Sequence, residues 1–326
     1  MRLVALIMSA CLLAACAPKA TANAPAKATS SPIASPSPIQ PSPTPQPSAS
    51  SQPSHVFVIV MENRTYNQVI SNGYISQLAA QYGVATDYHG VSHPSLPNYL
   101  AMTSGSTWGI ADDGFHALPA GGLGGQLNAA GIEWRAYMEG MTNGCFHSPY
   151  PYALKHNPFA YYGSACPSQI VPFSQFAADL SGSFPRFAWI TPDECHNGHD
   201  CSNAVSDAWL SRTVPSILAS TAWKDNGVLL ITWDEGEDSA NSVLTLVIRP
   251  NPLLHRSAQP YDHYSLLATI EDQFGLARLG LATQATPMND LLATATDRTR
   301  HPQPQLTADL LKRPRDSMLR PSPSSE

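Results

Sequence analysis

The residues that point most directly to chemistry lie in one stretch, residues 92–105, with the sequence SHPSLPNYLAMTSG. Ser95 stands where a helix is expected to begin, two residues before Pro97. A hydroxyl at a helix start lies among unpaired backbone N–H groups and the positive end of the helix dipole, which suit an attacking oxygen and an anionic phosphate. The stretch therefore indicates a phosphoryl-transfer site with Ser95 as nucleophile. The alternative is an ordinary capped helix, with Ser95 as its N-cap and Pro97 in the first turn.

A second group of residues has the side chains that bind divalent metals, and most of them follow apolar runs of the chain: Glu62, Asn63, Asp193, His199, Asp234, Glu235 and His263. Oxygen and imidazole ligands in this mixture suit zinc, manganese, calcium or magnesium better than a soft metal. Each residue also has an ordinary explanation, because a carboxylate after a strand often caps the next helix and a lone histidine is often structural. Their shared position after apolar runs favours a metal site.

The elements that must position these residues alternate along the chain. Continuous apolar, β-branched runs at 55–61, 187–190, 227–233 and 243–248 predict buried strands, and helical patterns lie between them, as at 204–220 and 265–274. Strands alternating with helices predict an α/β fold with a mostly parallel central sheet flanked by helices. Ligands of such sheets bind at the carboxyl ends of the strands, which is where three acidic groups are expected here.

The chain resembles the bacterial phosphoesterase family of the alkaline phosphatase superfamily, and within it the secreted acid phosphatases and phosphatidylinositol-3-phosphatases. The resemblance rests on five motifs in matching order: VMENRTY at 60–66, HPSLPNY at 93–99 followed by TSG, KHNPF at 155–159, ITWDEG at 231–236 and DHYS at 262–265. It spans nearly the whole predicted domain, and it implies an alkaline-phosphatase-like fold.

The resemblance also implies roles for individual residues. Ser95 matches the nucleophile and Asn98 an asparagine that donates to a phosphoryl oxygen. The residues that match the ligands of a metal shared with Ser95 are Glu62, Asn63, Asp234 and Glu235.

Asp193, His199 and His263 resemble the superfamily's second metal set. Asp193 and His199 are six residues apart where four is usual, so Asn197 or His196 is an alternative ligand, and one or two divalent ions are expected. His156 and Asn157 are expected to contact phosphate; hydrogen bonding within the loop is the alternative.

Together, these expectations predict a metal-dependent phosphomonoesterase, which is a phosphoric ester hydrolase that acts through a phosphoserine intermediate. A phospholipase C-type phosphodiesterase would use the same nucleophile and metal with a more open pocket. A non-catalytic surface-binding lipoprotein is a third alternative. A cysteine-dependent sulfatase is not favoured, since no cysteine here has the C-x-P-x-R context.

The ends of the chain predict export. Residues 1–16 have a short basic start, an apolar run and the sequence LAAC, which resembles a bacterial lipobox and predicts lipidation of Cys16; an ordinary cleaved signal is the alternative. Residues 17–54 contain ten prolines and predict a disordered tether. We expect a catalytic domain at 55–295 and a flexible tail at 296–326. The mature protein would be lipid-anchored to a membrane, outside the cytoplasm.

The net charge indicates which partners to expect, and the cysteine content indicates whether disulfides form. A net charge of -6 gives no basic footprint, so nucleic acid is not an expected partner, and the expected substrate is a phosphate ester. Once Cys11 is removed with the signal and Cys16 carries the lipid, four cysteines remain, and an even number in an exported protein suggests two disulfides. Proximity favours Cys145 with Cys166 and Cys195 with Cys201, although three pairings are possible. A thiolate zinc site is the alternative, but the chain has no C-x-x-C pair.

Overall fold

The structure is a computed structural model that describes residues 53–294. Its strands, in chain order, are β1 (Val56–Met61), β2 (Gly83–Ala85), β3 (Tyr88–His89), β4 (Trp134–Met138), β5 (Ile170–Pro172), β6 (Phe187–Thr191), β7 (Val228–Trp233), β8 (Thr245–Ile248), β9 (Arg256–Ser257) and β10 (Tyr261–Asp262). Its α-helices are α1 (Tyr66–Val69), α2 (Gly73–Gln81), α3 (Ser95–Ser104), α4 (Gly122–Ala129), α5 (Gly144–His147), α6 (Phe176–Ser181), α7 (Asn203–Ala219), α8 (Thr221–Lys224), α9 (His263–Phe274) and α10 (Asn289–Leu292). Short 3-10 helices are η1 (Leu154–His156), η2 (Pro158–Ala160), η3 (Phe173–Gln175) and η4 (Gly280–Thr283).

Eight of the described strands form one sheet in the order β5-β4-β6-β1-β7-β8-β2-β9, and β3 pairs with β10 separately. The five strands from β5 to β7 in this order are mutually parallel, whereas β8 is antiparallel to β7 and β2. The predicted α/β class, with a mostly parallel central sheet and flanking helices, is confirmed. The strand expected at 243–248 forms as β8, and it runs antiparallel because the short segment after β7 turns straight back beside it without a crossover.

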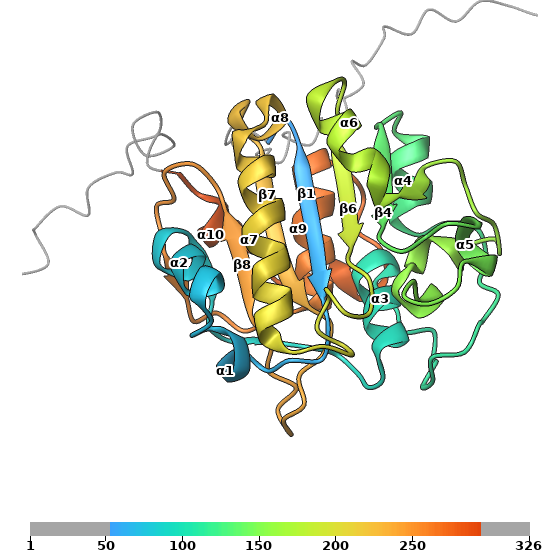
Figure 1. Ribbon diagram of the computed structural model, residues 1–326, viewed down its shortest axis with the longest axis horizontal. Coiled ribbons are helices and arrows are strands. Elements are labelled where there is room, and N and C mark those ends of the chain that lie inside the picture. The colour runs from blue at the N-terminus through green and yellow to red at the C-terminus, as the bar shows by residue number, and fades with distance from the viewer. Residues whose placement is uncertain (1–52, 295–326) are drawn as a thin grey trace, which may run out of the picture. The chain divides into compact units, whose positions relative to one another are not determined.

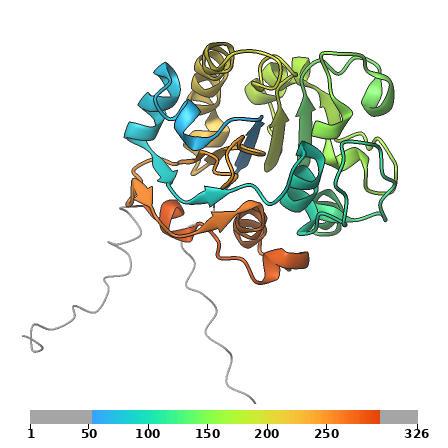
Figure 2. The same ribbon diagram turned by 90° about the horizontal axis from the view of Figure 1, so that it is seen from below.

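The central strands of the sheet form the middle of the hydrophobic core. All six residues of β1 are completely buried, and β7 is buried along its whole length. Burial on both faces explains why these strands read as continuous apolar runs without alternation. Helices α2 and α7 pack together on one side of the sheet, and α3 packs against α9 on the other (Figure 2).

This arrangement sends several strand ends to one edge of the molecule. The carboxyl ends of β1 and β6 lie together at the lower edge of the sheet in Figure 1. The registers place Met61 of β1 beside Trp233 of β7, and Met138 of β4 beside Thr191 of β6. The residues that follow β4, β6, β1 and β7 therefore line the same edge. Among residues 53–294, no helix is both long enough and apolar enough to cross a lipid bilayer.

Candidate active site

Ser95 is the first residue of α3, and its side chain faces the carboxylates at the sheet edge. The N-cap residue of the helix is Pro94, whose own side chain makes no capping hydrogen bond, so Ser95 is not the N-cap that the ordinary-helix alternative required. The Ser95 hydroxyl is buried and lies 3.0 Å from Glu62 Oε2 and 3.4 Å from Glu235 Oε1. A hydroxyl has one proton, so it donates to one of these carboxylates at a time. The predicted nucleophile is thus placed against two groups that can accept its proton.

The segment before Ser95 is held by Asn98. The Asn98 Oδ1 accepts hydrogen bonds from the backbone N–H groups of Val91 (2.9 Å) and Ser92 (3.0 Å). Its Nδ2 donates to the backbone carbonyls of Ser92 (2.9 Å) and Pro94 (3.1 Å). Asn98 therefore fixes the turn that presents the nucleophile. Donation to a phosphoryl oxygen, its predicted role, requires that one of these bonds be exchanged.

Glu62, Asp234 and Glu235 meet beside Ser95 because they follow neighbouring parallel strands, β1 and β7. Glu62 and Asp234 are completely buried and Glu235 is nearly so. Burial raises the pKa of Glu62 to about 8. Burial raises the pKa of Asp234 well above its usual value, and the nearby charges of Glu62 and Glu235 raise it further. Three carboxylates in so little water repel one another, and the repulsion would be relieved by a cation.

Asn63 joins this group through its backbone and its side chain. It adopts a left-handed conformation (φ 50°), which asparagine tolerates better than most residues, and its N–H donates to Asp234 Oδ1 at 3.1 Å. Among the described residues, Asn63 Oδ1 and Asp234 Oδ2 are buried with no hydrogen-bond partner. Buried polar atoms are normally paired, so unpaired oxygens beside clustered carboxylates are available to bind a cation. The oxygens of Glu62, Asn63, Ser95, Asp234 and Glu235 fit a hard divalent ion.

Two side chains that sequence reasoning missed complete the surroundings of these carboxylates. Tyr99 lies one helical turn after Ser95, and its hydroxyl donates to Glu62 Oε1 at 2.5 Å. The i, i+4 spacing along α3 was the available signal, because it puts Tyr99 and Ser95 on one face. His93 is half-exposed and its Nδ1 contacts Glu235 Oε2, so Glu235 lies between the nucleophile and an imidazole at the surface.

His156, predicted to contact phosphate, faces Glu62. Its Nε2 lies 3.1 Å from Glu62 Oε1 but outside hydrogen-bond geometry, and its Nδ1 lies 3.7 Å from Glu194 Oε2. Burial lowers the pKa of His156 to about 3, so the ring is neutral. Asn157 is also buried, and its Nδ2 donates to the hydroxyl of Tyr152 at 3.0 Å. For Asn157, this contact matches the alternative to phosphate binding, which was hydrogen bonding within the loop.

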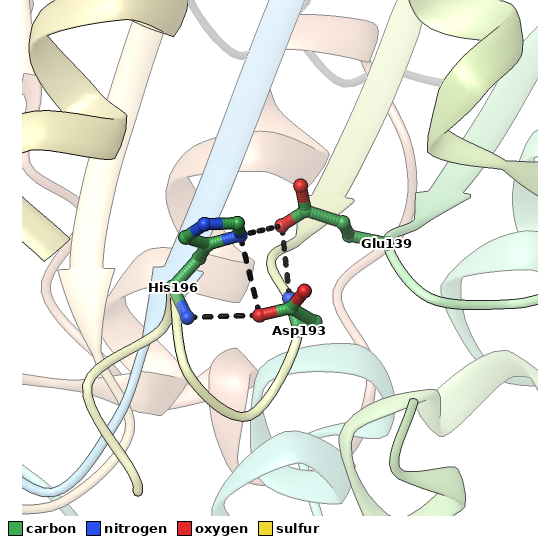
Figure 3. A group of neighbouring side chains, drawn as sticks. All are labelled: Glu139, Asp193 and His196. Atoms are coloured by element: carbon green, nitrogen blue, oxygen red, sulfur yellow. Dashed lines mark hydrogen bonds and ion pairs between the residues drawn. The ribbon is translucent and has the colours of Figure 1, made fainter. Parts of the chain in front are cut away.

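The three residues predicted to hold a second ion lie in three different surroundings. Asp193 contacts Glu139 and His196 (Figure 3), with 3.2 Å between Asp193 Oδ1 and His196 Nδ1 and 3.0 Å between His196 Nδ1 and Glu139 Oε2. These three side chains are grouped closely enough to hold a metal ion. The histidine that contacts Asp193 is therefore His196, which the sequence offered as an alternative ligand to His199.

His199 belongs to another group, with Glu194 and Asp200. Its Nδ1 lies 2.7 Å from Asp200 Oδ1, and its Nε2 lies 2.9 Å from Lys155 Nζ. The lysine must donate in this contact, so the ring nitrogen that accepts carries no proton.

His263 lies under the site, where it supports Asp234. Its Nε2 contacts the backbone carbonyl of Asp234, and its Nδ1 lies 3.1 Å from the hydroxyl of Tyr88. Burial lowers the pKa of His263 to about 4. Both ring nitrogens are therefore occupied by protein atoms in this structure, in an arrangement that fixes the backbone next to the predicted ligand Asp234.

Both predicted disulfides are present. Cys145 pairs with Cys166, and Cys195 pairs with Cys201. The second bridge closes a short loop that contains His196 and His199. The thiolate zinc site weighed as an alternative is excluded, because all four sulfurs are in disulfides.

Comparison with known proteins assigns the family. A family model described as "Phosphoesterase family" matches residues 71–251, more than half of the chain. The chain belongs to the phosphoesterase family. The matched part contains Ser95 and Asp234 but begins after Glu62, so the first predicted metal ligand lies outside it.

Curated relatives of this phosphoesterase are named as phosphatases. A protein of Mycobacterium tuberculosis named phosphatidylinositol-3-phosphatase is 31% identical, over 73% of this chain and 82% of its own length. A probable acid phosphatase of Kluyveromyces lactis is 28% identical, over 74% of this chain and 63% of its own length. The match thus spans less than two thirds of this fungal relative. The predicted hydrolase of phosphate esters is confirmed at the level of the family.

A solved structure from a study of glycosaminoglycan metabolism in Bacteroides thetaiotaomicron has the same fold. It superposes with a TM-score of 0.50 at 11% identity, covering 74% of this chain and 82% of that chain. At this identity the likeness concerns the fold and carries no information about substrate.

Proposed function

We propose that the protein is a metal-dependent phosphomonoesterase that acts through a phosphoserine on Ser95. The observation that carries the proposal is the position of the Ser95 hydroxyl, buried at a helix start within 3.0 Å of Glu62 and 3.4 Å of Glu235. The unpaired oxygens of Asn63 and Asp234 beside it support a divalent ion among these ligands. Such an ion, when bound, favours the deprotonated hydroxyl and offsets the charge of the phosphate.

The chain's own residues then account for the two steps. Glu62 or Glu235 accepts the proton of Ser95 as Oγ attacks phosphorus. The bond from phosphorus to the alcohol oxygen breaks, and this oxygen takes a proton from solvent. Water next attacks the phosphoserine, the bond from phosphorus to Ser95 Oγ breaks, Oγ takes its proton back from the glutamic acid, and inorganic phosphate is released. Tyr99 holds Glu62 in place during both steps.

The charge that develops on the phosphoryl oxygens needs donors close to Ser95. We assign this role to the backbone N–H of Leu96, at the start of α3, and to the ammonium group of Lys155, which share the carboxylate of Asp113. Lys155 sits in the KHNPF motif beside His156, and its positive charge also lowers the pKa of Glu62.

We propose that the substrates are phosphate monoesters of the kind that acid phosphatases hydrolyse, including phosphatidylinositol 3-phosphate. The name of the mycobacterial relative supports the lipid, and the names of the fungal relatives support soluble monoesters. We also propose export with a lipid anchor at Cys16, which lies outside the described residues.

Hydrolysis of a chromogenic phosphate monoester and of the matching diester, before and after chelation, tests the proposal. Wild-type protein should cleave the monoester faster and lose activity on chelation, and Ser95→Ala should lose it as well. Ser104→Ala is the matched control, because Ser104 is a buried serine at the other end of the same helix. Faster cleavage of the diester would indicate a phospholipase C-type enzyme instead. No cleavage of either ester by the metal-loaded protein would favour a binding protein.

A further inference from the structure

Asp113 contacts two hydrogen-bond donors, the backbone N–H of the residue after Ser95 and the ammonium group of Lys155. Its Oδ1 accepts a hydrogen bond from the backbone N–H of Leu96 at 3.0 Å, and its Oδ2 lies 3.3 Å from Lys155 Nζ. Leu96 directly follows Ser95, and Asp113 comes from the segment between α3 and α4. One carboxylate thus bridges the start of the nucleophile's helix and the ammonium group of Lys155.

These two donors are the ones a phosphoryl group on Ser95 needs. Backbone N–H groups at a helix start bind phosphate oxygens readily, and an ammonium group offsets their charge. A carboxylate has two oxygens and a negative charge, so it satisfies the same donors in the absence of substrate. The side chain of Asp113 is about one-third exposed (32%), whereas that of Lys155 is 17% exposed. Asp113 therefore borders solvent and can leave the donors without crossing the core.

We propose that Asp113 is an internal anion that occupies the position of a phosphate oxygen in the free enzyme and is displaced when a phosphate group binds. The proposal rests on the proposed phosphatase function and adds a residue that sets affinity for the phosphate group. Displacement frees Leu96 N–H and Lys155 for the substrate. After hydrolysis, the return of Asp113 to the same donors competes with inorganic phosphate and weakens product binding.

The chain supplies a matched control in the neighbouring residue. Asp112 has the same charge, but its side chain is 62% exposed. Its Oδ1 accepts from the N–H of Gly114 and from His116 Nε2, each at 2.7 Å. Asp112→Asn therefore removes one negative charge from the same segment without altering the contacts to Leu96 and Lys155.

The experiment measures inorganic phosphate as a competitive inhibitor of monoester hydrolysis and, separately, its binding to the metal-loaded full chain by calorimetry. Removing the negative charge that competes with phosphate for these donors should tighten phosphate binding about tenfold in Asp113→Asn. Asp112→Asn should stay within about twofold of wild type. The KM for the monoester should fall in Asp113→Asn as well, whereas a residue that only orients Lys155 would lower kcat.

Equal phosphate affinity in Asp113→Asn and Asp112→Asn, with normal hydrolysis by the wild type, would overturn the proposal and leave the phosphatase function standing. Absence of hydrolysis and of phosphate binding in the wild type would instead overturn the function itself. A crystal structure of the wild-type protein with phosphate bound provides a test without substitution. The proposal requires Asp113 to have left Leu96 N–H there, and it fails if both contacts persist beside the phosphate.

Discussion

Replacing Asp234 with asparagine should stabilise the metal-free protein while removing its response to metal. Asp234 is completely buried, and its Oδ2 has no hydrogen-bond partner among the described residues. The asparagine keeps an oxygen that can accept from Asn63 N–H, and its amide places a donor where the second oxygen lay. One of three crowded carboxylates is thereby neutralised without a change in volume.

The direction of the effect follows from the pKa of Asp234 itself, which burial raises well above its usual value and which the charges of Glu62 and Glu235 raise further. A carboxyl group whose pKa is raised by folding stabilises the fold fully below its unfolded pKa, about 4, and this contribution is lost as the pH rises towards the folded pKa. At pH 7 the buried acid therefore lowers the free energy of unfolding, by an amount on the order of the 1–3 kcal/mol that an unpaired buried polar group costs. Relieving part of it should stabilise metal-free Asp234→Asn by about 1–2 kcal/mol, which raises Tm by about 2–8 °C in a domain of this size.

The assay is thermal unfolding of the full chain in EDTA and with Zn²⁺, Mn²⁺, Ca²⁺ or Mg²⁺ added in turn. An ion at 100 times its Kd adds about 2.7 kcal/mol to the wild type, whereas Asp234→Asn should gain less than about 1 kcal/mol at the same concentration. Asp112→Asn, which removes an exposed carboxylate, should respond as the wild type does. The reasoning is refuted if Asp234→Asn is less stable than wild type in EDTA, or if metal stabilises both proteins equally.

Three further predictions concern other parts of the chain. Glu271 is buried in α9, and burial raises its pKa to about 7, so its stabilising contribution is complete below pH 4.5 and declines towards pH 7. In urea unfolding, the free energy of unfolding of Glu271→Gln should match that of wild type at pH 4.5 and exceed it by on the order of 1–3 kcal/mol at pH 8. A difference independent of pH would contradict this. Replacing Cys195 and Cys201 together with serine should lower the free energy of unfolding by about 2 kcal/mol, from the entropy of closing so short a loop, and an unchanged urea midpoint would count against it. Cys16→Ser should move the protein from the membrane fraction to the soluble fraction; a wild-type protein that is already soluble and begins elsewhere than a modified Cys16 would remove the anchor while leaving the phosphatase proposal intact.

The central strands and the proximity of Glu62 to Asp234 could be predicted because local sequence determines the strands. Residues 56–61 are apolar throughout, and residues 228–233 are apolar except for Thr232, because both faces of β1 and β7 are covered. The first charged residue after each run marks the end of the strand. Parallel pairing of β1 with β7 then brings Glu62 and Asp234 together. Proximity along the chain was likewise enough to pair the four cysteines.

The partners of the histidines could not be predicted, because they depend on contacts between distant segments. His263 contacts the backbone of Asp234, a group that sequence motifs do not display. His199 contacts Lys155 of η1, more than forty residues earlier in the chain, and Asp193 contacts Glu139, which follows β4. The role of Asp113 was hidden for the same reason, since an acidic residue in a surface segment has no pattern that distinguishes it from Asp112.

The central claim is that Ser95 carries the phosphoryl group, and trapping the intermediate tests it most directly. Acid quenching of the metal-loaded protein during turnover of a phosphate monoester, followed by peptide mass mapping, should place one phosphate on the peptide that contains Ser95. Ser95→Ala should show no trapped phosphate and lose turnover by several orders of magnitude while it remains folded. Rapid turnover by the wild type with no phosphate on Ser95, or near wild-type turnover by Ser95→Ala, would contradict the account.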